Sequence, residues 1–204
     1  MWALIEDNTI TKIINNPKAM LIGDTQYSRN IFSFRWSNEE REAIGLYEIV
    51  FDNSNKKDEA YYINTNQSFA FADGVVTASF GSATAKAHAD ANATDADGND
   101  LDPVVVIPGL KTKLIRTVKA QAATILQNTD WYIVRKADAD TDVPSAITTF
   151  RAAVRTKAAA METLITNASN TPAIETLYTY VNTADEGDPV VMERPLGEFP
   201  VLGS

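Results

Sequence analysis

The chain has 204 residues, 45% of them hydrophobic and 9% aromatic, which is enough to bury the core of one medium domain or two small ones. Its 18 Lys and Arg residues against 27 Asp and Glu residues give a net charge of −9, which argues against general binding to nucleic acids or anionic membranes, since both rely on basic patches. The sequence has no cysteine, which excludes disulfides, cysteine metal sites and thiol catalysis and fits a reducing cytoplasm.

The first 80 residues carry the signals of a small antiparallel β domain. Alternating apolar and polar residues flank the polar turn 6–8 and the Asp73–Gly74 pair, and Asp-Gly between such runs is a strong hairpin signal. Ser37 and Glu40 fit a capping box that opens a short helix, and Gly45 is placed to end it. Strands are expected over residues 1–5, 9–14, 31–36, 46–51, 60–64, 67–72 and 75–80.

Residues 81–109 differ in composition and are expected to form a polar linker with one short extended segment. Ala, Thr, Ser, Asn, Asp and Gly dominate residues 81–102, which is typical of solvated loops. The apolar run 104–107 predicts a strand or an extended docking segment. Residues 184–204 contain three prolines and three glycines, so we expect an extended arm or a disordered tail there, and no helix.

From Leu110 the apolar residues recur with a helical period. The first helix is expected to close at residues 128–130, and the acidic stretch 136–142 is expected to be a connector. A second helix should begin near Pro144, because proline is well tolerated in a first turn. Thr-Pro at 171–172 predicts a third, shorter helix.

These elements predict an α+β fold in two main parts joined by a linker. A small N-terminal antiparallel β domain precedes a C-terminal helical hairpin, and an extended arm follows. The expected boundaries are 1–80 for the β domain, 81–109 for the linker, 110–183 for the helical hairpin and 184–204 for the arm.

Three polar features suggest chemistry, and each has a simpler interpretation. His88, the only histidine, is interpreted as a solvated loop residue. Asp95–Asp100 resembles half of a calcium loop, but Ala93 and Val104 stand where an EF-hand has its first and last ligands. The alternate acids of Asp138–Asp142 lie on the expected connector and are interpreted as solvated. No phosphate loop, nucleophile elbow or zinc-protease motif is present, so no catalytic, cofactor or metal site is predicted.

The joint between the two long helices is the most informative part of the chain. Asp130 is expected to accept hydrogen bonds from backbone N–H groups in the turn after the first helix. Trp131 and Tyr132 are expected to wedge into the angle between the helices. Arg151 and Arg155 lie one helical turn apart and could pair with Asp130 or the acidic connector, or with acids on a partner. Pairing within the chain is the favoured alternative.

Four stretches around this joint follow a recurring order: a helix, Thr-Asp-Trp, a connector with proline, then a helix with aromatic-Arg-x-x-x-Arg. They are residues 110–114, 129–136, 143–144 and 149–155. This order resembles the C-terminal region of tail-fibre assembly or tail-assembly-chaperone-like proteins of tailed bacteriophages. The opening hairpin and Gly45–Val50 are similar to the small β domain that precedes that region in phage proteins. Glu198–Pro200 is similar to a short aromatic-Pro element at their end.

The resemblance implies a role in building or attaching tail fibres, without enzymatic chemistry. One expected role is a fibre-attachment or baseplate structural protein retained in the virion tail. The alternative is a transient tail-fibre assembly chaperone that leaves the particle. Either role implies synthesis in the host cytoplasm and an oligomeric assembly with a tail-fibre, baseplate or other tail protein. The residues expected at the partner interface are Trp131, Tyr132, Arg151, Arg155, Phe199 and Pro200.

Two further expectations concern membranes and a third functional class. The N-terminus is acidic from Glu6 and lacks the basic region of a signal peptide, and no apolar run approaches the roughly 20 residues that span a bilayer. The third class is an enzyme or a calcium-dependent binding module that uses the acids of Asp95–Asp100 or Asp138–Asp142. A calcium ligand of the folded state would raise its thermal stability, so calcium and EDTA test this hypothesis.

Overall fold

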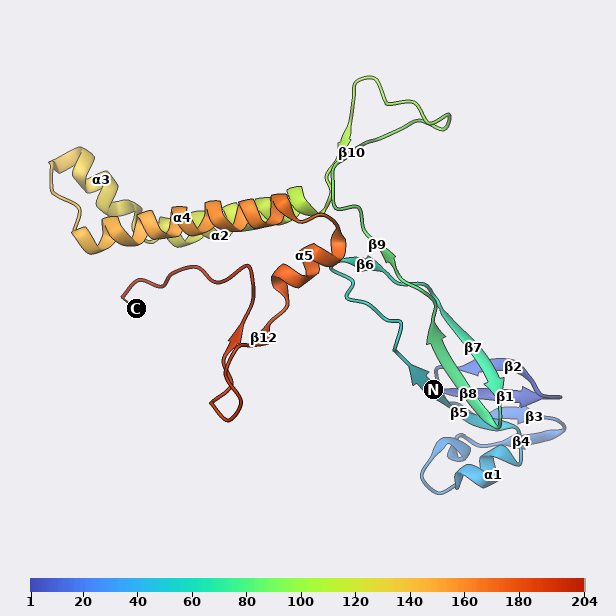
Figure 1. The fold of residues 1–204 in the computed structure, drawn as a ribbon. Coiled ribbons are helices and arrows are strands. Elements are labelled where there is room, and N and C mark those ends of the chain that lie inside the picture. Colours follow the sequence, from blue (N-terminus) through green and yellow to red (C-terminus); the bar gives the residue numbers. More distant parts are fainter. Residues whose placement is uncertain (204) are drawn as a thin grey trace. The chain divides into compact units, whose positions relative to one another are not determined.

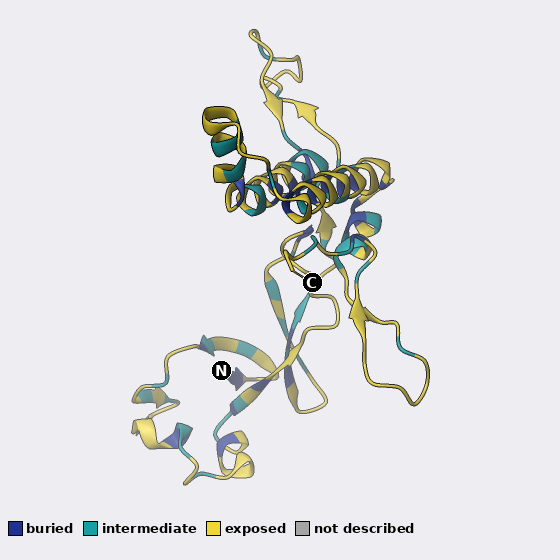
Figure 2. Cartoon of the chain, turned by 90° about the vertical axis from the view of Figure 1, so that its left-hand side faces the viewer, coloured by how far each residue is buried: buried dark blue, intermediate teal, exposed yellow. Residues whose placement is uncertain are grey.

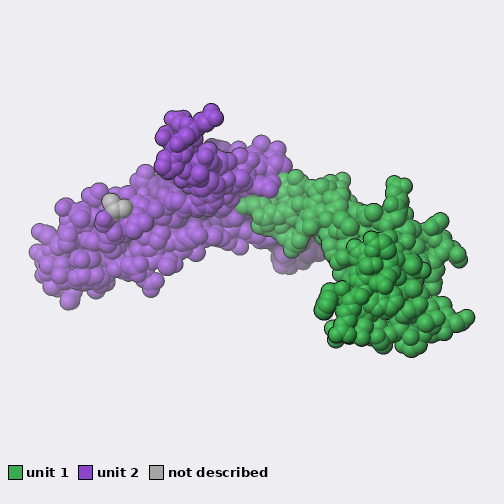
Figure 3. Space-filling model, turned by 90° about the horizontal axis from the view of Figure 1, so that it is seen from below, with its two compact units in different colours: residues 1–84 green, residues 85–204 purple. Residues whose placement is uncertain are grey.

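The structure, a computed structural model, describes residues 1–203. It divides into two compact units, Met1–Thr84 and Ala85–Ser204, shown in different colours in Figure 3. Unit 1 contains a β-sheet and one short α-helix, and unit 2 contains the long helices. The α+β class is therefore confirmed. Within residues 1–203, no helix is long and apolar enough to cross a membrane.

Unit 1 is built on a five-stranded sheet with the strand order β2-β1-β5-β8-β7 (Figure 1). Three neighbouring pairs are antiparallel, but β5 and β8 pair in parallel, with Ile49 opposite Val76. Cα atoms of the two edge strands, β2 and β7, approach within 8 Å, so the sheet curls towards closure. The strands are β1 (Trp2–Glu6), β2 (Thr9–Ile14), β5 (Leu46–Asp52), β7 (Gln67–Ala72) and β8 (Val75–Phe80).

Both predicted tight hairpins of unit 1 are confirmed. Asp7 and Asn8 join β1 to β2 with φ values of 49° and 58°, and Asp73 and Gly74 join β7 to β8 with φ values of 52° and 76°. Two successive left-handed residues form the turn whose twist matches that of antiparallel strands. Asp, Asn and Gly tolerate this region of φ better than other residues, so turn chemistry fixes the register of both hairpins.

Side chains are buried on both faces of the sheet, in two clusters, and Figure 2 colours the buried residues dark blue. Alternate residues of β1 divide between the faces, with Ala3 and Ile5 on one and Trp2 on the other. The first cluster contains Ala3, Ile5, Ile49, Val76 and Ala78, with Tyr47, Phe69 and Phe71 packed against it. The second contains Ile14, Ile31 and Leu46, which the segment between β2 and β5 covers.

The segment that covers the second cluster differs from the expectation at residues 31–36. A 3-10 helix, η1 (Arg29–Phe32), and a turn replace the expected strand, so that prediction was wrong. Arg41 explains the difference, since its guanidinium donates hydrogen bonds to the backbone carbonyls of Ile31, at 2.8 Å, and Ser33. Those carbonyls are thereby satisfied without a neighbouring strand. The hairpin of β3 (Met20–Ile22) and β4 (Thr25–Tyr27) was not predicted.

The helix after this segment, α1 (Asn38–Glu42), begins as predicted. The Ser37 hydroxyl accepts from the Glu40 N–H at 3.2 Å, and the Glu40 carboxylate accepts from the Ser37 N–H at 2.8 Å. This reciprocal pair is the capping box that the sequence indicated. Unit 1 also contains β6 (Tyr62–Ile63), and β9 (Thr84–Ala85) lies at the boundary between the units.

Unit 2 is organised around two long antiparallel helices, α2 (Leu110–Gln127) and α4 (Ser145–Asn167). The start of α2 meets the end of α4, where the Lys111 ammonium donates to the Thr166 carbonyl at 2.8 Å. Lys119 and Glu162 form an ion pair at 3.3 Å further along. The buried seam between the helices, together with one residue of the C-terminal arm, consists of Val118, Ala122, Val154, Ala158, Met161, Ile165 and Leu196.

The expected connector between the long helices is itself largely helical. Helix α3 spans Asp130–Ala139, so the expectation of a non-helical 136–142 stretch was wrong for its first half. Asp130 in the first turn and Lys136 in the last turn complement the helix dipole, which favours this short helix. Lys136 also forms ion pairs with Asp140 and Asp142 at 2.8 and 2.9 Å, which hold the turn that follows.

The remaining segments of unit 2 are short. Helix α5 (Thr171–Tyr178) confirms the third predicted helix, with Asn170 as its N-cap one residue before the expected position. The expected linker 81–109 contains β10 (Ala91–Asn92) and β11 (Val106–Ile107), which pair with each other. The arm contains β13 (Met192–Glu193), which pairs with β12 (Val181–Asn182).

Candidate functional site

The joint predicted from the sequence forms around the buried side chain of Arg151. Its guanidinium donates to the Leu126 carbonyl at 2.9 Å and to the Thr129 hydroxyl at 2.6 Å. It also pairs with the Asp130 carboxylate at 2.8 Å. The carbonyls in the last turn of a helix have no partner within the helix, so a cation there is favourable. Arg151 therefore ties the end of α2 to the start of α3, and pairing within the chain is confirmed for this residue.

Arg155, the second arginine of the motif, lies one turn further along α4 and is exposed. No ion pair to it is found within residues 1–203. Arg151 and Arg155 therefore have different surroundings, although their spacing places them near one face. Arg151 serves the joint, whereas the guanidinium of Arg155 is available to acids on another molecule.

An aromatic and cationic surface covers the outer side of α3. The rings of Trp131 and Tyr132 lie 3.8 Å apart between centroids, and the Arg135 guanidinium carbon lies 4.8 and 5.5 Å from them. Trp131 is 51% exposed, so the expectation that it wedges between the long helices was wrong. The Nε atom of Arg135 is buried and has no hydrogen-bond partner among residues 1–203. We call Trp131, Tyr132 and Arg135 the aromatic-arginine surface.

The C-terminal arm packs on the helices of its own chain. Leu196 is 2% exposed, belongs to the core of α2 and α4, and donates its N–H to the Leu177 carbonyl at 3.0 Å. Phe199 and Pro200 are half-buried beyond it. Hollows of about 390 and 460 Å³ lie along this part of the arm, and Phe150 and Pro200 line both. The predicted interface residues of the arm, Phe199 and Pro200, thus lie partly buried against the helices of their own chain, and Phe199 packs against the core.

A polar clamp holds the arm just before Phe199. The Arg194 guanidinium pairs with the Glu198 carboxylate at 2.7 Å, and the Tyr180 hydroxyl donates a hydrogen bond to the same carboxylate. Burial acts to raise the pKa of Glu198, but the hydrogen bonds from Tyr180 and Arg194 outweigh it and hold the pKa below its usual range. The same hydrogen bond raises the pKa of Tyr180. Glu198 is therefore the charged centre of the clamp near neutral pH.

The other polar residues that the sequence singled out lie in turns or next to local backbone hydrogen bonds. Asp95 accepts hydrogen bonds from the backbone N–H groups of Asp97 and Asn99, both at 2.9 Å, which is a turn rather than a cation site. The His88 side chain is partly exposed, and its carbonyl accepts from the Lys111 N–H at 3.1 Å. Within residues 1–203, no group of three or more His, Asp or Glu side chains is placed to hold a metal ion.

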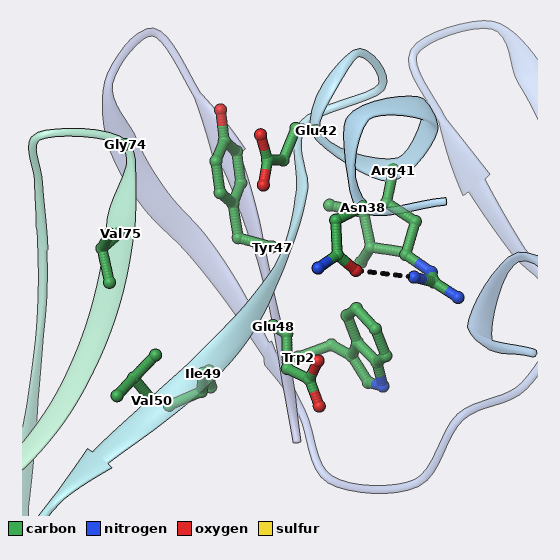
Figure 4. A pocket seen from close by; sticks show the side chains of 11 residues that line it. Trp2, Asn38, Arg41, Glu42, Tyr47, Glu48, Ile49, Val50, Gly74 and Val75 are labelled. Atoms are coloured by element: carbon green, nitrogen blue, oxygen red, sulfur yellow. Dashed lines mark hydrogen bonds between the residues drawn. The ribbon is translucent and has the colours of Figure 1, made fainter. Parts of the chain in front are cut away.

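Unit 1 has a separate cavity of about 260 Å³ between β5, α1 and the turn before β8 (Figure 4). The close-up shows Trp2 and Glu48 on one side of it and Tyr47 and Glu42 on another. Arg41 also lines it, but its guanidinium is bonded to the backbone carbonyls described above, to the Asn38 amide oxygen at 2.9 Å, and lies over the Trp2 ring. Arg41 therefore serves the fold, and the two glutamates give this cavity an acidic rim.

Comparison with protein-family models, curated proteins and solved structures found no match to this chain. The joint, the aromatic-arginine surface and the arm therefore have to be interpreted from their own geometry. Sequence reasoning predicted Trp131, Tyr132 and Arg151 as interface residues, but it assigned no role to Thr129 and Arg135, although both lie in the motif. The signal for Arg135 was present, because it lies three and four residues after the two aromatic residues and so shares their face of a helix.

Proposed function

We propose that this chain is a non-enzymatic structural protein of a bacteriophage tail, retained in the virion at a fibre-attachment or baseplate position. The observation that carries the proposal is the joint around Arg151. Three residues of the motif that resembles phage tail-assembly proteins meet there, since Arg151 bonds to both Thr129 and Asp130. This motif fixes the angle between helices and presents an aromatic face. Both features suit a subunit whose role is to bind other proteins.

The distribution of exposed apolar side chains supports the same role. Unit 2 exposes large apolar residues on several segments, among them the stretch that ends in β11, helix α3, the hairpin of β12 and β13, and the end of the C-terminal arm. Apolar residues gathered on protruding segments mark contact sites for other proteins. On α3, Trp131 beside Arg135 offers the pair of residue types that most often dominate the binding energy of interfaces. We propose the aromatic-arginine surface as the contact for a fibre or baseplate protein.

Mass spectrometry of gradient-purified phage particles tests the proposal. We expect the chain in the particles, at a copy number that matches the symmetry of its attachment point. A chain found in infected cells and missing from particles would contradict retention. That outcome would favour the alternative, a transient fibre-assembly chaperone, whose client segment would bind the hollows beside Phe199 and Pro200.

The contact surface can be tested in the same particles. Trp131→Ala should reduce the number of copies per particle while leaving the purified chain folded, because the side chain is half exposed and contributes little to the core. Phe34→Ala is the matched control, since Phe34 is 94% exposed in unit 1. Equal incorporation of the Trp131→Ala variant and the unmodified chain would exclude this surface as the attachment point.

A further inference from the structure

The ribbon formed by β10 and β11 projects from the N-terminal end of α2 (Figure 1). Four successive apolar residues, Val104–Ile107, are each between 49% and 58% exposed. Successive residues of a strand point to opposite faces, so β11 and the residues just before it expose apolar side chains on both faces of the ribbon. An isolated two-stranded ribbon is marginally stable in water, which indicates that this one is completed by further contacts.

The backbone register shows which polar groups the free edge presents. Ala93 donates its N–H to the Val105 carbonyl at 2.7 Å, and Ile107 stands opposite Ala91. Val105 and Ile107 therefore direct their backbone groups towards β10. Because these directions alternate along a strand, the N–H and C=O groups of Val104 and Val106 face away from β10. They form a short free edge that can accept one more strand.

Prolines set the length of that edge. Pro103 and Pro108 stand on either side of Val104–Ile107 and have no N–H to donate. A strand added to this edge can therefore pair along only four residues. Such a short, bounded edge favours a short partner segment of the same kind and limits open-ended aggregation.

Charge divides the ribbon into an acidic end and a basic end. The acidic end is the turn beyond β10, which carries Asp95, Asp97, Asp100 and Asp102. The basic end is the start of α2, where Lys111 and Lys113 outnumber the one carboxylate there, that of Asp90, which is bonded to Gly109 and Thr112. Two ribbons aligned antiparallel along β11 bring the acidic end of each towards the basic end of the other. A parallel alignment would place like charges together.

We propose that a second copy of this chain pairs with the free edge of β11, antiparallel and around a twofold axis at Val105. In that register Val104 faces Val106 of the partner subunit, and the twofold axis repeats the pair. The result is a four-stranded sheet of two ribbons, with four new N–H···O=C bonds and facing valines. The proposal is independent of the proposed tail function, since it concerns the isolated protein.

Sedimentation equilibrium of the full chain tests this interface. We expect a monomer–dimer equilibrium that weakens as salt is added, because the charged ends are solvent-exposed. Val106→Pro removes the N–H of residue 106, which points away from β10. Because each copy loses this donor, the dimer loses two of its four intermolecular hydrogen bonds. At about 0.7 kcal/mol for each bond, dimerisation should weaken about tenfold. Val106→Thr, which keeps the N–H and the branched shape, is the matched control.

Exchanging the charges of one acidic and one basic residue provides a second test of the interface. Asp97→Lys and Lys113→Glu should each weaken the dimer, and the double variant should restore it, because this arrangement brings the acidic end of one copy towards the basic end of the other. Circular dichroism of each variant checks that unit 2 stays folded. A chain that is monomeric throughout the accessible concentration range, or a dimer that Val106→Pro does not weaken, would overturn the proposal.

Discussion

The two units of this chain differ in where their buried residues come from. In unit 1, short hairpins and α1 bury side chains on both faces of one sheet, and residues 14–46 supply the second cluster from adjacent elements. In unit 2, the core is a single seam between α2 and α4, and Leu196 completes it from the C-terminal arm. Both cores join distant parts of the sequence, as Ala3 and Val76 do in unit 1 and Val118 and Leu196 do in unit 2, but unit 2 exposes more large apolar side chains to other molecules.

The largest expected effect is a cavity in either core. Met161→Ala should lower the free energy of unfolding of unit 2 by about 4 kcal/mol, and Leu46→Ala should lower that of unit 1 by a similar amount. Both side chains are fully buried, at 1% and 0% exposure. Far-UV circular dichroism follows the helices of unit 2 during chemical unfolding. Tryptophan fluorescence in a Trp131→Phe background follows unit 1, because the remaining tryptophans are Trp2 and Trp36.

These two variants also test the division between the units. If Met161→Ala shifts only the circular dichroism transition and Leu46→Ala only the fluorescence transition, the two cores unfold separately. A shift of both transitions by either variant would contradict the separation and indicate one cooperative core.

The next largest effect on the free energy of unfolding is expected from a substitution in the C-terminal arm. Leu196→Ala should lower the free energy of unfolding of unit 2 by about 3 kcal/mol, because the side chain is buried between the long helices. Leu202→Ala, on the same arm but 47% exposed, should change it by less than about 0.5 kcal/mol. Thermal denaturation of both variants measures the difference. Equal, small effects would mean that the arm is a tail that contributes nothing to the fold.

An intermediate effect on the free energy of unfolding is expected from a substitution at the joint around Arg151. Arg151→Met keeps the aliphatic stem but removes the hydrogen bonds to Leu126 and Thr129 and the ion pair with Asp130. The cost should be about 2 kcal/mol, since Asp130 is more than half exposed and regains water. Arg155→Met should be close to neutral for stability, because no bond of its side chain is found within residues 1–203. Urea titration separates the two, and a destabilised Arg155→Met would show that both arginines serve the joint.

Local chemistry explains which parts of the fold could be predicted. The turns at Asp7–Asn8 and Asp73–Gly74, the capping box at Ser37 and the helix start near Pro144 each depend on residues next to one another, so the sequence indicates them directly. The parallel pairing of β5 with β8 depends on residues 27 positions apart, as Ile49 and Val76 are, and no local signal encodes it.

The candidate site likewise combines features that the local sequence indicates with features that depend on the tertiary fold. The spacing of Arg151 and its motif predicted an intrachain partner, and the ion pair with Asp130 confirms it. The sequence could not show that Leu196 enters the core, because that depends on how the arm folds back. Nor could it show that α3 turns Trp131 outward, because the direction of a short helix depends on the joint that holds it.

The smallest expected effect is a pH dependence confined to unit 2. The Asp90 carboxylate accepts hydrogen bonds from the Gly109 N–H at 2.8 Å and the Thr112 hydroxyl at 2.9 Å, so it caps the start of α2 from outside the helix. Those two bonds, and to a lesser degree the charge of Arg116, hold the pKa of Asp90 below its usual range. The interaction therefore stabilises the folded state above the usual range of an aspartate and is lost as pH falls through the lowered pKa.

Asp90→Asn isolates this contribution, because an amide oxygen still accepts from Gly109 but cannot titrate. Measured by helical circular dichroism, the unmodified chain should be the more stable of the two above the usual pKa range of an aspartate, and this difference should shrink as pH falls and vanish below the lowered pKa of Asp90. Asp95, Asp142 and Glu198 also have lowered pKa values in unit 2, so only the difference between the two titrations reports on Asp90. Identical acid titrations would mean that the charge of Asp90 contributes nothing to the stability of α2. Its first turn would then be held by neutral hydrogen bonds, among them those from Leu110 and Lys111 to the carbonyls of Ala87 and His88.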